Sequence, residues 1–187
     1  PSIQNGRISV LVRHHYDPDG DFVGFNLSPL TSSAFFGWPS ELASFGMYTT
    51  NTIGITPQPY LSPQLFLSPT LDGDLRGDLL EYIINVHSSG VWTVNIINRS
   101  EPGTPVATTN IVISANSTVR SIRFGTFIGG TNQSLSFDRI RIMYDPATPR
   151  VGPFNISIVD GTNAWIHGSL RGGLSFSDAV TSRVISS

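Results

Sequence analysis

The tripeptide Arg76-Gly77-Asp78 is the most specific short motif of this chain. Gly77 allows a tight and exposed bend, which would present the guanidinium of Arg76 and the carboxylate of Asp78 together. A receptor can bind such a pair, because the carboxylate completes the coordination of a metal ion while the guanidinium pairs with an acidic group. The motif therefore predicts a receptor-binding turn. The alternative is an ordinary turn that opens the next strand, since the tripeptide arises by chance in roughly one such chain in twenty.

A second group of polar residues, Asp17, Asp19 and Asp21, alternates with Pro18 and Gly20. Three carboxylates on one loop are hard oxygen ligands, which suit Ca²⁺. The spacing departs from the EF-hand pattern, because the glycine lies inside the acidic triplet and no glutamate occupies the twelfth loop position. Two interpretations stay open, a calcium site and a solvated acidic turn. We expect no other cofactor.

Tryptophan side chains offer a further binding chemistry, since a flat aromatic face can stack on the apolar face of a sugar ring. Trp165 follows the turn-like loop 160–163, and Trp38 lies in a proline-rich stretch. Both are therefore candidates for glycan stacking. Trp92 alternates with valines, which indicates packing in the core instead.

Residues suited to catalysis are few. The chain contains no cysteine and no lysine, which excludes thiolate nucleophiles, cysteine-bound zinc and Schiff-base chemistry. The sequence also lacks the Gly-x-Ser-x-Gly elbow of a serine hydrolase. Glu81 with Asp138 is the carboxylate pair that glycosidase chemistry would use. We expect that the protein is not an enzyme.

The elements that must position these side chains are β-strands. Short alternating or β-branched runs recur at 7–14, 22–27, 79–87, 91–97, 106–114, 120–128, 134–144, 154–159 and 165–170. Ser88-Ser89-Gly90 indicates a hairpin turn, and a change of parity within 134–144 predicts a bulge near Asp138 and Arg139. The pattern predicts an all-β fold, an antiparallel β-sandwich or jelly roll, in a single domain over residues 1–187.

The segment 28–69 has a looser pattern, because six prolines interrupt it. We expect a long loop-rich region there, anchored by aromatic side chains, with one helical turn at 40–45. The core should then come mainly from strands after Asp78. Since the chain starts at Pro1 with neither a methionine nor a signal peptide, we also expect that it was cut from a longer polypeptide. The alternative is an initiator methionine removed before Pro1.

Composition narrows the range of partners. The formal net charge is −2 and only 13% of the residues are charged, so a nucleic-acid contact is not expected. No apolar run approaches the roughly 18 residues of a membrane span, so membrane insertion is not expected either. Low charge suits packing between subunits, because few ionised groups lose their hydration at an interface.

Taken over its whole length, the chain resembles the protruding or surface domain of a coat protein from small non-enveloped RNA viruses, including those of invertebrates. The resemblance rests on the cysteine-free β-sandwich pattern rich in Ser, Thr and Asn, on the internal start and on the Arg76-Gly77-Asp78 tip. It implies a capsid protein at the virion surface, a dimer or trimer of copies of itself, and attachment to a host receptor or glycan through residues 76–78.

A second resemblance concerns Ser136-Phe-Asp-Arg-Ile-Arg-Ile-Met-Tyr144. This run is similar to the late strand of laminin-G-like lectins and of jelly-roll carbohydrate-binding modules. That similarity implies an extracellular module of a secreted protein. Trp165 would then stack on the glycan, and the loop from Asp17 to Asp21 would hold calcium.

Overall fold

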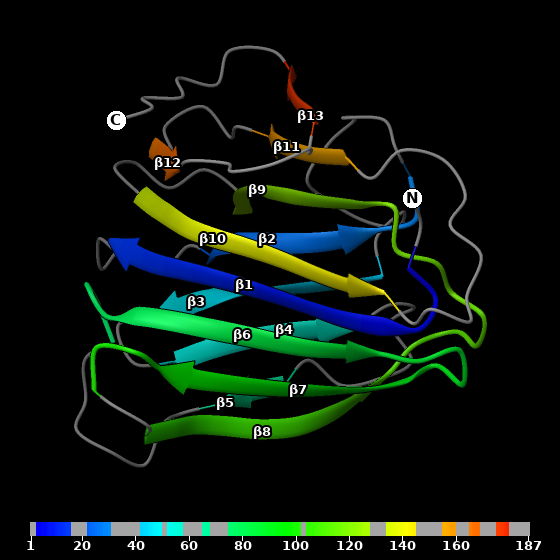
Figure 1. The fold of residues 1–187 in the computed structure, drawn as a ribbon. Coiled ribbons are helices and arrows are strands. Elements are labelled where there is room, and N and C mark those ends of the chain that lie inside the picture. Colours follow the sequence, from blue (N-terminus) through cyan, green and yellow to red (C-terminus); the bar gives the residue numbers. More distant parts are fainter. Residues whose placement is uncertain are drawn as a thin grey trace.

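The computed structural model describes residues 3–15, 22–30, 42–49, 52–57, 65–67, 75–101, 104–127, 134–144, 155–159, 165–168 and 175–179. Every regular element in these ranges is a β-strand, and the strands form two sheets that face each other (Figure 1). The predicted all-β sandwich is therefore confirmed. Among the described residues there is no helix with the length and apolarity of a membrane span.

The sheet that faces the viewer in Figure 1, called the front sheet here, has six strands. In spatial order they are β12 (Trp165–Gly168), β10 (Ser134–Tyr144), β1 (Gly6–His15), β6 (Leu79–Val86), β7 (Val91–Asn98) and β8 (Thr104–Val112). Strands β6, β7 and β8 form an antiparallel meander, as the predicted hairpin turn at 88–90 requires.

The second sheet, called the back sheet, has seven strands. In spatial order they are β13 (Ser175–Ala179), β11 (Asn155–Val159), β9 (Ser121–Phe127), β2 (Phe22–Ser28), β3 (Ala43–Thr49), β4 (Thr52–Pro57) and β5 (Leu65–Leu67). Most neighbouring strands are antiparallel, but β10–β12, β9–β11 and β11–β13 are parallel. From β8 to β13 the chain changes sheet at every strand, so parallel neighbours are joined by crossovers through the opposite sheet.

The core lies between the sheets, because strand residues alternate between a buried and an outward side. The ring of Tyr82 in the front sheet contacts the ring of Phe25 in the back sheet edge-on, with 5.3 Å between the ring centroids. Phe25 in turn stacks on Phe45, with 5.2 Å between the centroids. Burial raises the pKa of the Tyr82 phenol above its ordinary value of 10.0, and the hydroxyl lies 3.2 Å from Nε2 of His14. Trp92 is fully buried as predicted.

Three strands occupy parts of the segment 28–69 for which an irregular chain is predicted. The helical turn expected at 40–45 is wrong from Ala43 onward, where β3 begins, and residues 40 and 41 lie outside the described ranges. Phe45 and Met47 point into the core while Ser44 and Gly46 alternate with them, which is the period of a strand. As a result, the core draws on both halves of the chain and not mainly on strands after Asp78.

Two backbone features shape the sheets. The predicted bulge is confirmed: Leu11 pairs with Arg139 and Val12 with Phe137, so Asp138 has no partner on β1. In the back sheet, Gly24 pairs with both Gly46 and Gly125. A Cβ atom on Gly24 would collide with the main chain of β3, so the close approach of these strands requires glycine.

Candidate recognition surface

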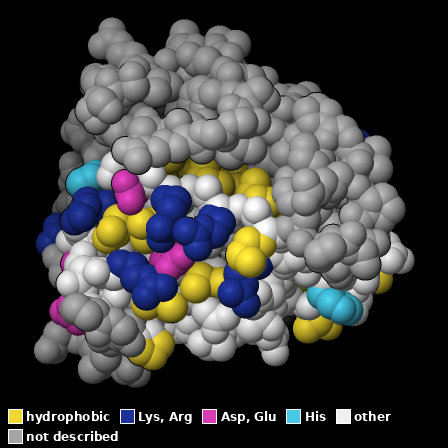
Figure 2. Space-filling model, viewed as in Figure 1, with side chains coloured by type: hydrophobic (Ala, Val, Ile, Leu, Met, Phe, Trp, Pro, Cys, Tyr) yellow, Lys and Arg dark blue, Asp and Glu magenta, His cyan; other side chains and the backbone are white. Residues whose placement is uncertain are grey.

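The outer face of the front sheet gathers most of the charge that the structure describes. The odd-numbered residues of β1 point away from the core because its even-numbered residues are buried in it. Figure 2 shows this face, with Lys and Arg side chains grouped around an acidic side chain and interspersed with apolar ones. Since the chain has no lysine, all these basic side chains are arginines.

Four arginines follow one another along the two strands β1 and β10. Ser9 lies opposite Arg141, and Leu11 lies opposite Arg139. Along the direction of the strands, the two arginines of β10 therefore lie between Arg7 and Arg13 of β1. We call the row the arginine track, which in order consists of Arg7, Arg141, Arg139 and Arg13. Same-face residues along a strand are about 6.8 Å apart, so the track is about 20 Å long.

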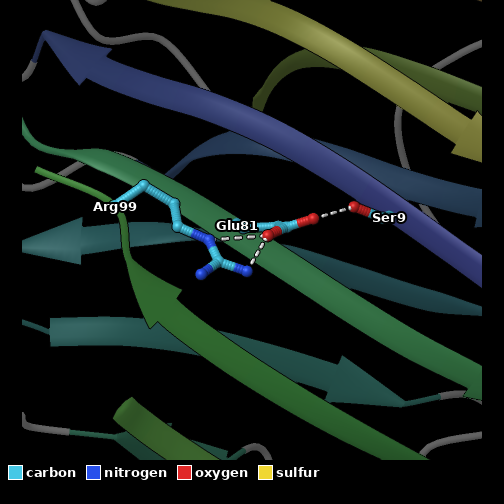
Figure 3. Close-up of polar contacts among 3 residues, drawn as sticks. All are labelled: Ser9, Glu81 and Arg99. Carbon is cyan, nitrogen blue, oxygen red and sulfur yellow. Dashed lines mark hydrogen bonds and ion pairs between the residues drawn. The ribbon is translucent and has the colours of Figure 1, made fainter. Parts of the chain in front are cut away.

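Beside the track, Glu81 of β6 is held by two partners, one on β1 and one directly after β7 (Figure 3). Ser9 donates its hydroxyl to Oε1 at 2.5 Å, and Arg99 donates from Nε to Oε2 at 2.7 Å and from Nη2 to the same oxygen. Burial alone would raise the pKa of Glu81. The hydrogen bonds from Ser9 and Arg99 and the charges of Arg99 and Arg139 outweigh it and hold that pKa below 4.5.

The track itself keeps its positive charge. Nε of Arg7 donates to Oδ1 of Asn85 at 2.9 Å, and Nη1 of Arg13 donates to the carbonyl of Gly77. Both acceptors are neutral. Arg139 and Arg141 are exposed, and within the described ranges neither makes a hydrogen bond or an ion pair. Glu81 is already paired with Arg99, whereas Asp138, exposed at the bulge next to Arg139, leaves one carboxylate beside the four guanidiniums of the row.

Strands β7 and β8 carry a polar ladder on the same face. The Thr93 hydroxyl donates to Oδ1 of Asn110, and the Thr108 hydroxyl donates to Oδ1 of Asn95, each at 3.0 Å. These threonines satisfy the amide oxygens and orient both amides. Among the residues that the structure describes, the amide nitrogens of Asn95 and Asn110 have no acceptor, so they can donate to a ligand.

The Arg76-Gly77-Asp78 motif forms a turn where β6 begins. Gly77 has a φ of 76°, the backbone that a type II turn requires at its third residue, and its N–H donates to the carbonyl of His14 at 2.9 Å. The Arg76 side chain is exposed. The Asp78 carboxylate is half-buried and accepts a hydrogen bond of 2.6 Å from Nδ2 of Asn98. The turn therefore presents its guanidinium more openly than its carboxylate.

The other residues singled out from the sequence are spread over the fold. Asp17, Asp19, Asp21 and Trp38 lie outside the described ranges. Trp165 is the first residue of β12, where its backbone pairs with Ser134, and its side chain is not described. Within the described ranges, no three His, Asp or Glu residues lie close enough together to hold a metal ion.

Glu81 and Asp138 do not form an arrangement suited to glycosidase chemistry. Asp138 lies exposed at the bulge of β10, whereas both carboxylate oxygens of Glu81 are engaged by Ser9 and Arg99. A general acid needs a raised pKa, and the pKa of Glu81 is lowered.

Sequence reasoning missed the arginine track. A partial signal was present in Arg7-x-Ser9-x-Leu11-x-Arg13 and in Arg139-x-Arg141, since alternate residues of a strand share one face. What could not be seen was the pairing of β1 with β10, which interleaves the two sets.

Comparisons with known proteins give little further information. No protein-family model and no curated protein matches the chain. One solved structure that it matches is a heptameric SAP-like pentraxin from Limulus polyphemus, with 12% identity and a TM-score of 0.38. The match covers 64% of this chain and about half of the pentraxin chain, 49%. At this level, the likeness carries no argument about function.

Proposed function

We propose that this chain is the surface domain of a viral coat protein, a non-enzymatic module that contacts copies of itself and attaches the particle to a host cell. The observation that carries the proposal is the outer face of the front sheet. Exposed guanidiniums, oriented amides and apolar side chains share one open surface there. Such a surface suits recognition of a partner better than conversion of a substrate, which needs a concave site.

Contacts between copies are supported by the apolar side chains on this face. Val91 and Val112 lie directly opposite each other on β7 and β8 and are 48% and 55% exposed. Met143, at the end of β10, is 52% exposed. Arginine and methionine are enriched in protein interfaces, while lysine and acidic residues are depleted. The composition of this face agrees with that preference.

The location on a particle is tested by expressing the reading frame that contains this chain together with its flanking sequence. We expect particles in negative-stain electron microscopy, labelled on their outside by an antibody raised against residues 1–187. Absence of particles, or labelling only after the particles are disrupted, would contradict the coat role.

A carbohydrate-binding module of a secreted protein is the second candidate, and the polar ladder of β7 and β8 favours it. Amides oriented by threonine hydroxyls can hydrogen-bond to sugar hydroxyls without any charge. This function predicts binding of neutral oligosaccharides on a glycan array at any salt concentration. Asn95→Ala or Asn110→Ala should abolish that binding, and an array without neutral hits would exclude this function.

A further inference from the structure

We propose that the arginine track binds a linear sulfated polysaccharide, laid along β1 and β10. The proposal rests on the recognition role given above and names the chemical class of the ligand. The track offers four guanidiniums in a row, and the planar guanidinium fork matches the oxygens of an anionic group with two parallel hydrogen bonds.

The four arginines fall into two kinds. Arg7 and Arg13, at the ends of the track, are oriented by neutral acceptors, namely the Asn85 amide oxygen and the Gly77 carbonyl. These bonds leave the remaining donors of each guanidinium to a ligand and reduce the entropy lost on binding. Arg139 and Arg141, in the middle, are exposed and make no hydrogen bond among the described residues, so all their donors can serve a ligand.

The electrostatics of the face favour an anion although the whole chain has a net charge of −2. Within the described ranges, this face carries five arginines, the track and Arg99, against two carboxylates, Glu81 and the exposed Asp138 at the bulge, so its net charge is positive. Glu81 is turned toward Ser9 and Arg99, which use both of its oxygens. Its charge is thereby compensated locally, and the track can attract a polyanion at a distance of several ångströms.

A polysaccharide fits the surroundings of the track better than a nucleic acid. Proteins that bind single-stranded nucleic acid stack its bases on aromatic side chains. The described outward side chains of the front sheet include no Phe, Tyr or Trp. They include instead Asn85 next to Arg7 and the polar ladder beyond it, which can hydrogen-bond to sugar hydroxyls.

The test uses the purified chain and a heparin octasaccharide, measured by isothermal titration calorimetry at several salt concentrations. We expect Arg139→Gln and Arg141→Gln each to weaken binding about tenfold and to reduce the slope of log affinity against log salt by about one. Arg120→Gln is the matched control. Arg120 is an exposed arginine outside the track, and its loss should change neither quantity. Removal of the sulfates from the octasaccharide should abolish binding.

Three results would overturn the proposal: no binding of heparin, an equal loss in the Arg120 control, or tighter binding of single-stranded RNA that the same track variants abolish. The outcome is separable from the coat role. If heparin does not bind but antibody still labels intact particles, only the track proposal fails. If heparin binds through the track but no particles form, the coat role fails and the polysaccharide site stands.

Discussion

Arg99 donates two hydrogen bonds, from Nε and Nη2, to one oxygen of Glu81, while Ser9 occupies the other oxygen (Figure 3). The Glu81 side chain is 9% exposed and that of Arg99 is 41% exposed. The carboxylate is therefore nearly buried, and one end of its guanidinium partner reaches solvent. This arrangement joins β1, β6 and the residue that follows β7, and it keeps the Glu81 carboxylate from neutralising the arginine track.

Replacing Glu81 by Gln should lower the free energy of unfolding by about 1–2 kcal/mol. The loss reflects charge-assisted hydrogen bonds, reduced because Arg99 is partly in water. Ser9→Ala removes one donor to the same buried carboxylate and should cost about 1.5–3 kcal/mol. Urea denaturation at pH 7 measures both. Equal stability of Glu81→Gln and the unsubstituted chain would show that the cluster does not stabilise the sheet.

The same carboxylate should make stability depend on acid. Since the pKa of Glu81 is below 4.5 in the folded chain, the unfolded chain takes up this proton first as the pH falls. The contribution of Glu81 is complete above about pH 4.5 and is lost as the pH falls through the lower, folded pKa. The difference in unfolding free energy between the unsubstituted chain and Glu81→Gln should shrink below pH 4.5. A difference that stays constant down to pH 2 would exclude a lowered pKa.

Gly24→Ala should destabilise the back sheet by about 1–3 kcal/mol, because the new Cβ would meet the main chain of Phe45 and Gly46, which can yield only by moving β3. Gly77→Ala is the comparison. A Cβ there meets nothing within 4 Å, and only the positive φ of 76° opposes it, at about 1 kcal/mol. Thermal unfolding ranks the two, and a larger loss at Gly77 would contradict the packing argument.

Asp78→Glu should abolish attachment to host cells if the turn is a receptor site, because the longer side chain moves the carboxylate relative to the backbone of the turn. Glu101→Asp is the control, since it changes an exposed acidic residue by the same methylene group. Flow cytometry with labelled chain measures attachment, and circular dichroism verifies the fold. Unchanged attachment in Asp78→Glu would mean that the turn has a structural role only, in which Asp78 accepts the hydrogen bond from Asn98 at the start of β6.

How much could be predicted from the sequence depended on how far apart along the chain the residues involved lie. Alternation within one segment was sufficient to identify most strands, the burial of Trp92 and the bulge at Asp138. Strand β3 was missed because Ser44 and Gly46 alternate with its buried residues, which leaves few β-branched residues to reveal it.

The candidate site could not be predicted in the same way. Ser9 and Glu81 are 72 residues apart, and the arginine track needs the pairing of β1 with β10. Such pairings are set by the register of whole strands and by the closure of long loops. No local pattern of residue types reveals these pairings. The sequence therefore identified the individual arginines but not their order on the surface.

The exposed valine pair makes the proposed contact between copies testable. Val91 and Val112 lie opposite each other on the outer face, and burying them against a second copy would remove apolar surface from water. We expect the purified chain to self-associate in analytical ultracentrifugation and Val112→Asp to weaken this association at least about tenfold, because a carboxylate would lose its hydration in the contact. Leu30→Asp is the matched control, since Leu30 is 41% exposed and follows β2 of the back sheet. If Leu30→Asp weakens association as much as Val112→Asp, the contact does not lie on the front sheet. If the unsubstituted chain stays monomeric at every concentration, the proposed contact between copies through this face is wrong.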